Sequence, residues 1–531
     1  MTEQKKYAVK ISLIVALGGF LMGFDASVIS GVIKFIEPEF ALSKLQLGWA
    51  VSSLTLTSTL AMMVAGPLST IYGRKLVLKY TAALYAISAI GSALAPDFAT
   101  LVIARMIGGF GVGASLIIAP MYIAEISPPD IRGRMVSFNQ LNIVLGISVA
   151  FFTNYLILQL GQSGSGWTQS LGLDIYQWRY MLGLELLPAI LYFGFLFMVP
   201  YSPRWLIMKR REDEALVILK KVSSESQALK DIEAVKFSLS SEKNKSKVPV
   251  SALFKPALRL VLTIGIVVAV LQQITGINSV FFYAPMIFEQ SGIGTDASFS
   301  QAILVGITNL VFTVLAILFI DRFGRKILLK IGLAGIALSM FLLSYGFGSA
   351  TYTLTETSIA SLPAHIDQGK AAMLGGKTFD SDIAFKNAIV EAFGDDDAKS
   401  VESDLITAAI KMNSLLILLG IIGFVASFAV SIGPVMWVLF SELFPNWIRG
   451  LAISFTGFIN SGISFLVQLV FPWELATLGS SMTFLIYGVF AAVGLIFIWT
   501  LIPETKNKSL EEIEALLVNK KKLGTDPVQA K

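Results

Sequence analysis

The stretch IYGRKLVLK, residues 71–79, returns in a related form as DRFGRKILLK at residues 321–330. Each copy follows a long apolar run, and further paired motifs follow both copies in the same order. Ordered self-similarity of this kind indicates a duplicated architecture. The further pairs are EISPPDIRGR (125–134) with ELFPNWIRG (442–450), and PYSPRWL (200–206) with IPETKNKSL (502–510). The chain is therefore predicted to consist of two similar halves.

The composition is that of an integral membrane protein. Of the 531 residues, 55% are hydrophobic and only 15% are charged, whereas soluble proteins carry about 25% charged residues. The chain has no cysteine and one histidine, His365, which excludes disulfides, thiolate chemistry and a histidine-based metal site. The net charge of +5 is small for this length and does not indicate nucleic-acid binding.

Twelve segments are long and apolar enough to cross a bilayer, for which about 20 residues are needed. An even number of spans places both termini on the same side of the membrane. The predicted spans are residues 8–33, 47–72, 76–95, 99–125, 135–160, 178–200, 258–288, 299–320, 327–348, 412–440, 449–471 and 479–502. The fold class expected is an all-α membrane protein.

The loops on one side of the predicted membrane collect most of the basic residues. They include Lys5, Arg74, Arg132 and the stretch 204–255. The longest loop on the other side, 350–411, has ten Asp and Glu residues against five Lys and no Arg. Because basic loops stay inside, both termini are predicted to be cytoplasmic.

The chain is predicted to have four parts. Residues 1–200 form the first six-helix half, and 201–256 form a cytoplasmic helical linker. Residues 257–503 form the second half, with an extracellular or periplasmic insertion at 350–411, and 504–531 form a cytoplasmic tail. The acidic run GDDDAKS in the insertion is interpreted as a solvated surface rather than as a cation site.

Three ionisable residues fall at one depth in the first half. Asp25, Arg105 and Glu185 are each six to eight residues from the outer end of their predicted span, which is roughly 10 Å at ~1.5 Å per residue. A charge inside a membrane helix is costly and indicates a functional site. If Arg105 leaves Asp25 during a conformational change, burial favours the neutral acid, and Asp25 carries a proton. A structural ion pair between two helices is the alternative.

The second half carries buried amides instead of charges. Amides both donate and accept hydrogen bonds, so they suit the hydroxyl groups of a neutral polyol, and Trp437 can face the C–H surface of a sugar ring. Hydrogen bonding between helices is the alternative use of such amides. Glycine and proline at Gly276, Pro285 and Gly433–Pro434 are expected to break helices beside this site. The amides are Gln272, Gln273, Asn278, Asn309 and Asn460.

Paired acidic and basic residues stand at the predicted inner ends of the helices. A glutamate and an arginine are seven positions apart in both halves, and an arginine of the first repeat accompanies each pair. We expect each glutamate and the arginine seven positions away to form a salt bridge that closes the inner side and breaks when it opens. For the lone arginines of the first repeat, the enrichment of inner loops in basic residues is the favoured explanation. The residues of both kinds are Arg74, Glu125 and Arg132 in the first half, and Arg325, Glu442 and Arg449 in the second.

These motifs together resemble the sugar porter family of the major facilitator superfamily. They are DRFGRK (321–326), RMIGGFGVG (105–113), PMYIAEISPPDIRGR (120–134), SPRWL (202–206), QQITGIN (272–278), GPVMWVLFSELFPNWIRG (433–450) and PETK (503–506). The resemblance implies two six-helix halves related by a pseudo-two-fold repeat and import of a neutral monosaccharide by proton symport through alternating access. A proton-independent facilitator and a symporter of an inositol-like polyol are the alternatives.

The resemblance also assigns residues. The five amides and Trp437 match sugar contacts of the family, Asp25 with Arg105 matches its proton symporters, and Asp321 joins the inner gate. The sequence departs from the family pattern at Thr70, Ile71, Tyr201, Ile147 and Phe282, and the last change leaves Tyr283 as the nearby hydroxyl.

Other classes of protein fit less well. An enzyme needs a nucleophile with its base or a metal site, a primary pump needs a phosphate-binding loop, and a receptor needs an output domain; none is evident in the sequence. We therefore expect a cell-membrane transporter without cofactor or metal. Its partners are a sugar, a proton and the lipid bilayer, and its functional form is a monomer.

Overall fold

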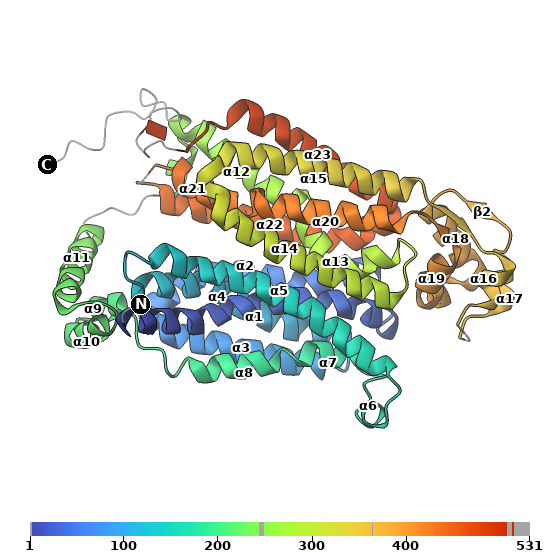
Figure 1. Cartoon of the computed structure of the whole chain (residues 1–531), viewed down its shortest axis with the longest axis horizontal. Helices are drawn as coiled ribbons and strands as arrows, with labels where there is room; N and C mark the ends of the chain where they lie inside the picture. The colour runs from blue at the N-terminus through green and yellow to red at the C-terminus, as the bar shows by residue number, and fades with distance from the viewer. Residues whose placement is uncertain (1–2, 244–248, 364, 446, 507–511, 514–531) are drawn as a thin grey trace. The chain divides into compact units, whose positions relative to one another are not determined.

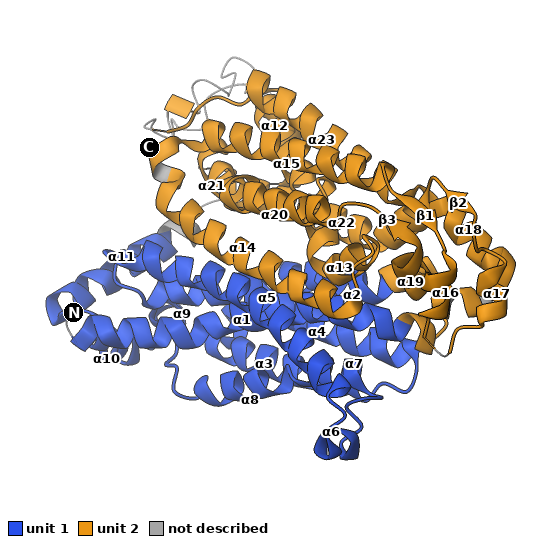
Figure 2. Cartoon of the chain, turned by 45° about the vertical axis from the view of Figure 1, so that its right-hand side comes forward, with its two compact units in different colours: residues 1–36, 49–246 blue, residues 37–48, 247–531 orange. Residues whose placement is uncertain are grey.

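The computed structural model describes residues 3–243, 249–363, 365–445, 447–506 and 512–513 (Figure 1). The chain divides into two compact units (Figure 2). Unit 1 consists of residues 1–36 and 49–246, and unit 2 of residues 37–48 and 247–531. The predicted tail, 504–531, lies largely outside the described residues.

Unit 1 is built from long helices that follow one another through short loops. In lipid, every backbone N–H and C=O group must be paired within the segment, so apolar runs of this length fold as helices. Helix α3 packs against α4, α7 and α8. The helices are α1 (Glu3–Glu39), α2 (Lys44–Tyr72), α3 (Arg74–Ala93), α4 (Phe98–Ile126), α5 (Arg132–Gln162), α6 (Gly166–Ser170), α7 (Gln177–Gly183) and α8 (Leu186–Phe195).

The linker helices belong to the core of unit 1. They are α9 (Pro203–Met208), α10 (Glu212–Val222) and α11 (Glu225–Lys243). Buried side chains of these helices, among them Trp205, Leu206 and Leu219, share one hydrophobic core with the N-terminal parts of α1 and α3 and the C-terminal part of α4.

Unit 2 repeats the long-helix architecture. Helix α15 packs against both α20 and α23, and α12 packs against α22. Two 3-10 turns, η1 (Val250–Phe254) and η2 (Pro256–Leu258), lead into the first helix. The helices are α12 (Arg259–Ile274), α13 (Ile277–Glu289), α14 (Thr295–Phe323), α15 (Arg325–Gly348), α20 (Ser414–Val430), α21 (Ile432–Leu443), α22 (Arg449–Thr477) and α23 (Gly479–Leu501).

The duplicated motif makes the same turn in both units. Gly73 separates α2 from α3 with φ 92° and ψ 146°, and Gly324 separates α14 from α15 with φ 91° and ψ 157°. Only glycine adopts this backbone conformation without strain. The repeat read from the sequence is thus a repeat of backbone geometry.

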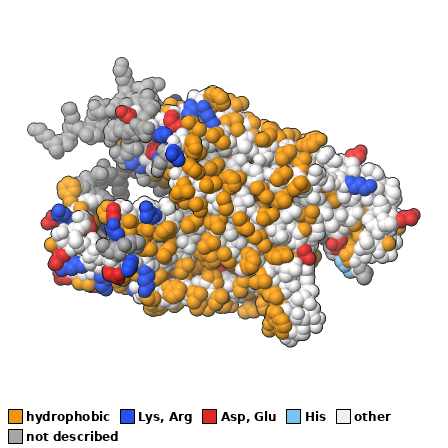
Figure 3. Space-filling view, viewed as in Figure 1, with side chains coloured by type: hydrophobic (Ala, Val, Ile, Leu, Met, Phe, Trp, Pro, Cys, Tyr) orange, Lys and Arg blue, Asp and Glu red, His pale blue; other side chains and the backbone are white. Residues whose placement is uncertain are grey.

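The predicted spans correspond to the long helices. Within the described residues, eleven helices or broken helices are long and apolar enough to cross a membrane. The remaining predicted span, 178–200, is formed by α7 and α8, each too short by itself. Hydrophobic side chains cover the long helices on the face drawn in Figure 3, and charged side chains gather over α9 to α11 and over the insertion. The twelve-helix prediction is confirmed.

Three spans are broken, each for a local reason. Gly276 has the left-handed φ of 89° between α12 and α13, and Tyr283 leaves helical geometry two residues before Pro285. The break between α20 and α21 falls at Ser431, with φ −126° and ψ −104°, three residues before Pro434. Between α7 and α8, Pro188 offers no N–H to the carbonyl of Leu184, which instead accepts the N–H of Leu187 at 3.2 Å.

Gly276→Ala is expected to destabilise unit 2. A left-handed conformation costs an alanine roughly 1–2 kcal/mol, and the added Cβ would meet the ring of Tyr487. The melting temperature in detergent should fall by several degrees. Gly194→Ala is the control, because a Cβ at Gly194 in α8 meets nothing within 4 Å; an equal loss in both variants would contradict the explanation.

The insertion between α15 and α20 has its own hydrophobic core. Tyr352, Leu354, Phe385, Ile389 and Leu405 are buried there together. Its three short strands form an antiparallel sheet in the order β2-β1-β3. The elements are β1 (Thr351–Thr353), α16 (Glu356–Ala360), α17 (Gln368–Ala372), β2 (Thr378–Phe379), α18 (Asp382–Phe393), α19 (Asp395–Ala409) and β3 (Ile410–Lys411).

The insertion is fastened to other parts of unit 2 by polar contacts. Asp382 accepts the backbone N–H of Ser480 at 2.9 Å and so caps the start of α23. On α19, Glu402 lies 3.6 Å from Lys386 and also interacts with Lys44, the first residue of α2. Burial acts to raise the pKa of Glu402, but the two ammonium groups outweigh it and hold this pKa below its usual value.

The stabilisation by Glu402 should depend on pH. A carboxyl whose pKa is lowered by folding stabilises the protein above its unfolded pKa of about 4.3 and loses this effect as the pH falls through its folded pKa. Glu402→Gln should therefore lower the melting temperature at pH 7, and the difference from the wild type should shrink below about pH 4. Glu391→Gln, which alters an exposed side chain on α18, should show no difference at either pH.

Candidate functional site

The three predicted ionisable residues of unit 1 lie together. Asp25 is in the middle of α1, Arg105 is in α4, and Glu185 is at the junction of α7 and α8. Arg105 Nη1 is 3.5 Å from Asp25 Oδ1, and both side chains are 1–2% exposed. Arg105 Nε also donates to the backbone carbonyl of Ala50 at 3.1 Å. The guanidinium interacts with both carboxylates.

One cation serves two acids in this cluster. Asp25 Oδ2 and Glu185 Oε1 are buried and have no hydrogen-bond partner among the described residues. Glu185 is itself only 2% exposed. A buried charge without a partner is costly, so a proton on one of the acids would remove the excess negative charge.

The close approach of α4 to Asp25 depends on a small residue. A Cβ at Gly108 would stand 2.7 Å from Asp25 Oδ2 and 2.5 Å from Ser88 Oγ. These distances are shorter than a carbon–oxygen contact allows. A larger residue at this position would displace the acid.

Four of the predicted amides form one network in unit 2. Asn460 on α22 donates to Gln272 Oε1 at 2.7 Å and accepts from Gln273 Nε2 at 3.2 Å. Asn278 donates to Gln273 Oε1 at 2.8 Å. The break at Gly276 brings Asn278, on α13, to the two glutamines at the end of α12.

Two residues of this network were not predicted. Ser464 accepts from Asn278 Nδ2 at 2.6 Å, and Gln468 donates to Ser464 Oγ at 2.8 Å. Both follow Asn460 at intervals of four residues, so they share one face of α22. That spacing is the signal in the sequence that would have found them.

The other predicted substrate residues form no side-chain hydrogen bond with the four amides among the interactions described. Tyr283 is fully buried and donates to the backbone carbonyl of Gln468 at 2.9 Å. Asn309 on α14 is buried. Trp437 on α21 is about half exposed and meets Phe440 edge to face, with ring centroids 6.0 Å apart.

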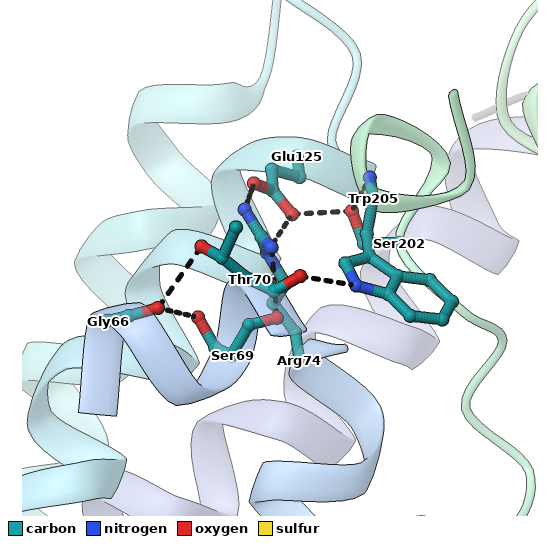
Figure 4. A network of polar contacts seen from close by, with 7 residues as sticks. All are labelled: Gly66, Ser69, Thr70, Arg74, Glu125, Ser202 and Trp205. Carbon is teal, nitrogen blue, oxygen red and sulfur yellow. Dashed lines mark hydrogen bonds and ion pairs between the residues drawn. The ribbon is translucent and has the colours of Figure 1, made fainter. Parts of the chain in front are cut away.

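Two of the three predicted inner-end residues of unit 1, Arg74 and Glu125, form the centre of a compact polar network (Figure 4). The guanidinium of Arg74 binds Glu125 through Nη2 at 2.9 Å and Nε at 3.1 Å, and donates to the carbonyl of Ser69 at 3.1 Å. The hydroxyl of Ser202 donates to the same carboxylate. Trp205 Nε1 donates to the carbonyl of Thr70 at 3.1 Å, which ties α9 to the end of α2.

Unit 2 carries an equivalent network. Arg325 is 2.8 Å from Glu442, and the hydroxyl of Thr505 donates to that carboxylate at 2.6 Å. Thr505 thus has the same role in unit 2 as Ser202 has in unit 1, and neither hydroxyl was predicted from the sequence. Glu504 accepts the first N–H groups of α15 from Arg325 and Lys326. The side chain of Asp321 lies outside the described residues.

The arginine that follows each glutamate by seven residues does not bind that glutamate in the interactions described. Arg132 donates to the backbone carbonyl of Ser127, and Arg449 donates to that of Phe444, five residues earlier in both cases. The ion pairs to Glu125 and Glu442 therefore come from Arg74 and Arg325.

Glu125→Ala is expected to destabilise the protein strongly. Arg74 and Glu125 are 6% and 9% exposed, and removal of one partner of a buried pair costs about 3–5 kcal/mol. The melting temperature should fall accordingly. Glu214→Ala removes the acid of an exposed pair with Arg211 and should cost at most about 1 kcal/mol. An equal fall in melting temperature in the two variants would show that the buried Arg74–Glu125 pair stabilises the protein no more than an exposed pair does.

Comparisons with known proteins agree with this architecture. The family profile described as sugar (and other) transporter matches residues 11–364 and 400–517. The chain is 34% identical to the arabinose-proton symporter of Bacillus subtilis (strain 168), over 96% of this chain and 95% of that protein. It is also 34% identical to the D-xylose-proton symporter of Escherichia coli (strain K12), over 96% of both.

Solved structures give the same result. The inward open conformation of the xylose transporter XylE from E. coli matches with a TM-score of 0.73 and 32% identity, covering 96% of this chain and all of that one. Such likeness over nearly the full length shows the family as well as the fold. The chain is a multi-pass membrane protein that belongs to the sugar transporter family of the major facilitator superfamily.

Proposed function

We propose that this protein imports a neutral monosaccharide together with a proton by alternating access. The observation that carries the proposal is the charge imbalance of the buried cluster. Asp25 and Glu185 share the single guanidinium of Arg105, and each has an oxygen without a partner among the described residues. A group that binds one proton and releases it when its surroundings change is what a symporter needs.

The amide network supports the sugar as the co-substrate. Gln272, Gln273, Asn278 and Asn460 offer donors and acceptors without a fixed charge. When a sugar binds, each hydrogen bond between two amides can be exchanged for a hydrogen bond from an amide to a sugar hydroxyl. No buried donor or acceptor is then left without a partner. We assign Tyr283, Asn309 and Trp437 to the same site. Names of relatives, which include arabinose-proton and D-xylose-proton symporters, agree with this substrate class.

Coupling follows from the two states of the ion pair. While Arg105 faces Asp25, the carboxylate is stabilised and a proton is released. When the change of access moves them apart, the neutral acid is favoured and a proton is bound. We further propose that both termini are cytoplasmic and that the protein acts as a monomer in the cell membrane without a cofactor. In the outward-facing state, the ion pairs Arg74–Glu125 and Arg325–Glu442 close the inner side.

Uptake by proteoliposomes tests the proposal. The purified protein is reconstituted and offered radiolabelled hexoses, pentoses and polyols, while the external pH is recorded. The expected result is accumulation of at least one sugar, accompanied by alkalinisation of the medium. Saturable uptake without alkalinisation would indicate a facilitator and would overturn the coupling.

A further inference from the structure

A series of buried hydroxyl groups leads from the acid cluster toward the end of unit 1 that carries the N-terminus. They belong to Ser88 and Tyr85 on α3, Ser115 on α4 and Tyr192 on α8, and each side chain is at most 2% exposed. Buried polar side chains normally have hydrogen-bond partners. The hydroxyls of Tyr85 and Ser115 have none with hydrogen-bond geometry among the described residues.

Shared neighbours place these groups close to one another. Ser88 Oγ and Asp25 Oδ2 both face Gly108, at 2.5 and 2.7 Å from its added Cβ position. Tyr85, three residues before Ser88 on α3, interacts with Asp25, Glu185, Ser115 and Tyr192. Ser115 Oγ and the Tyr192 hydroxyl both face Gly18, at 2.5 and 2.8 Å from its added Cβ position.

Residue positions along α1 and α8 show the direction of the series. Gly18 precedes Asp25 by seven residues on α1, and Tyr192 follows Glu185 by seven residues on the oppositely directed α8. Seven helical residues span about 10 Å. Farther along, the buried hydroxyls of Ser12 and Ser127 are 3.4 Å apart near the end of α4. The path lies entirely within unit 1.

We propose that Ser88, Tyr85, Ser115 and Tyr192 form a hydroxyl relay that conducts the proton between Asp25 and the inner end of unit 1. Each hydroxyl accepts one proton on its oxygen and gives up its own, so one proton moves and no group keeps a charge. The Asp25 carboxylate left behind pairs with Arg105. Ordered water, which occupies buried polar sites of this kind, completes the steps between neighbouring hydroxyls. The inference rests on the proposed proton symport.

The relay separates the proton's route from the sugar's. The sugar site proposed above consists of unit 2 residues, whereas the relay is made of unit 1 residues that have no part in the amide network. Loss of the relay should therefore slow proton movement without changing sugar binding. A purely structural role for the hydroxyls predicts instead that both partial reactions fall together.

The double variant Tyr85→Phe with Ser115→Ala tests the relay in proteoliposomes with radiolabelled D-xylose and L-arabinose as probes. Proton-driven uptake should slow by about tenfold or more, in line with the loss of positioned proton-transfer groups. Counterflow exchange at equal pH, which requires no proton release, should continue and also shows that the variant is folded. Ser115→Ala alone should show the same pattern with a smaller effect.

Tyr122→Phe is the matched control. Tyr122 is equally buried in unit 1. Its hydroxyl donates to the carbonyl of Pro200 at 2.8 Å, as that of Tyr192 donates to the carbonyl of Val15 at 3.4 Å, but Tyr122 interacts with Tyr7 and Glu125 rather than with the acid cluster. Its proton-driven uptake should match the wild type. A double variant that keeps full proton-driven uptake overturns the relay alone. A wild type that moves sugar without alkalinisation overturns the symport, and the relay with it.

Discussion

Replacing Asp25 by asparagine is expected to abolish accumulation of sugar against its gradient. The amide has nearly the same size as the carboxyl group, but it cannot take up or release a proton. The ratio of internal to external sugar in proteoliposomes should fall to equality, and sugar-induced alkalinisation should disappear. Counterflow exchange should persist, because exchange requires only that the loaded carrier change sides.

The control for this variant is Asp97→Asn. Asp97 caps the start of α4 by accepting the N–H of Thr100 at 2.8 Å, and asparagine is an equally good cap. Accumulation should be normal in that variant. If Asp25→Asn still accumulated sugar, the pair with Arg105 would be structural and the protein would couple its proton elsewhere or not at all.

Loss of the central amides should weaken sugar binding more than any other change in unit 2. Gln273→Ala removes an amide that donates to Asn460 and accepts from Asn278, and Asn278→Ala removes one that also bonds Ser464. In the proposed complex each of these amides bonds a sugar hydroxyl, and its removal leaves that buried hydroxyl unsatisfied, which costs about 1–3 kcal/mol. The dissociation constant measured by calorimetry or tryptophan fluorescence should rise by roughly 5- to 150-fold.

Asn413→Ala provides the comparison for these two variants. Its side chain accepts the N–H of Leu415 at the start of α20, outside the network. The variant should lose some stability but bind sugar as the wild type does. Unchanged binding in both Gln273→Ala and Asn278→Ala would remove the network from the substrate site.

The sequence predicted the spans well because membrane insertion depends on local properties. An apolar run of about 20 residues must be a helix in lipid whatever surrounds it. The break at Gly276 was equally local, since its φ of 89° suits glycine. The break expected at Gly433–Pro434 occurs at Ser431 instead, because a proline disturbs the turn that precedes it.

Features that depend on contacts between distant segments could not be predicted. The hydroxyls of Ser202 and Thr505 reach the carboxylates of Glu125 and Glu442 across 77 and 63 residues of sequence. Serine and threonine are too common for such a role to stand out. The helix break at Glu185 was not predicted for another reason. The span 178–200 was assigned from its hydropathy alone, which does not register the helix-breaking effect of Pro188, three residues after Glu185.

The insertion begins and ends at the same place. Strand β1, which follows α15, pairs with β3, which precedes α20, so that Thr351 stands opposite Lys411. A segment whose two ends are neighbours can be gained, lengthened or lost in evolution without moving the helices on either side. The family profile leaves residues 365–399 unmatched, and these lie inside this segment. The segment between α15 and α20 is thus a site where a gene can acquire an additional small domain while the membrane-spanning helices are inherited unchanged.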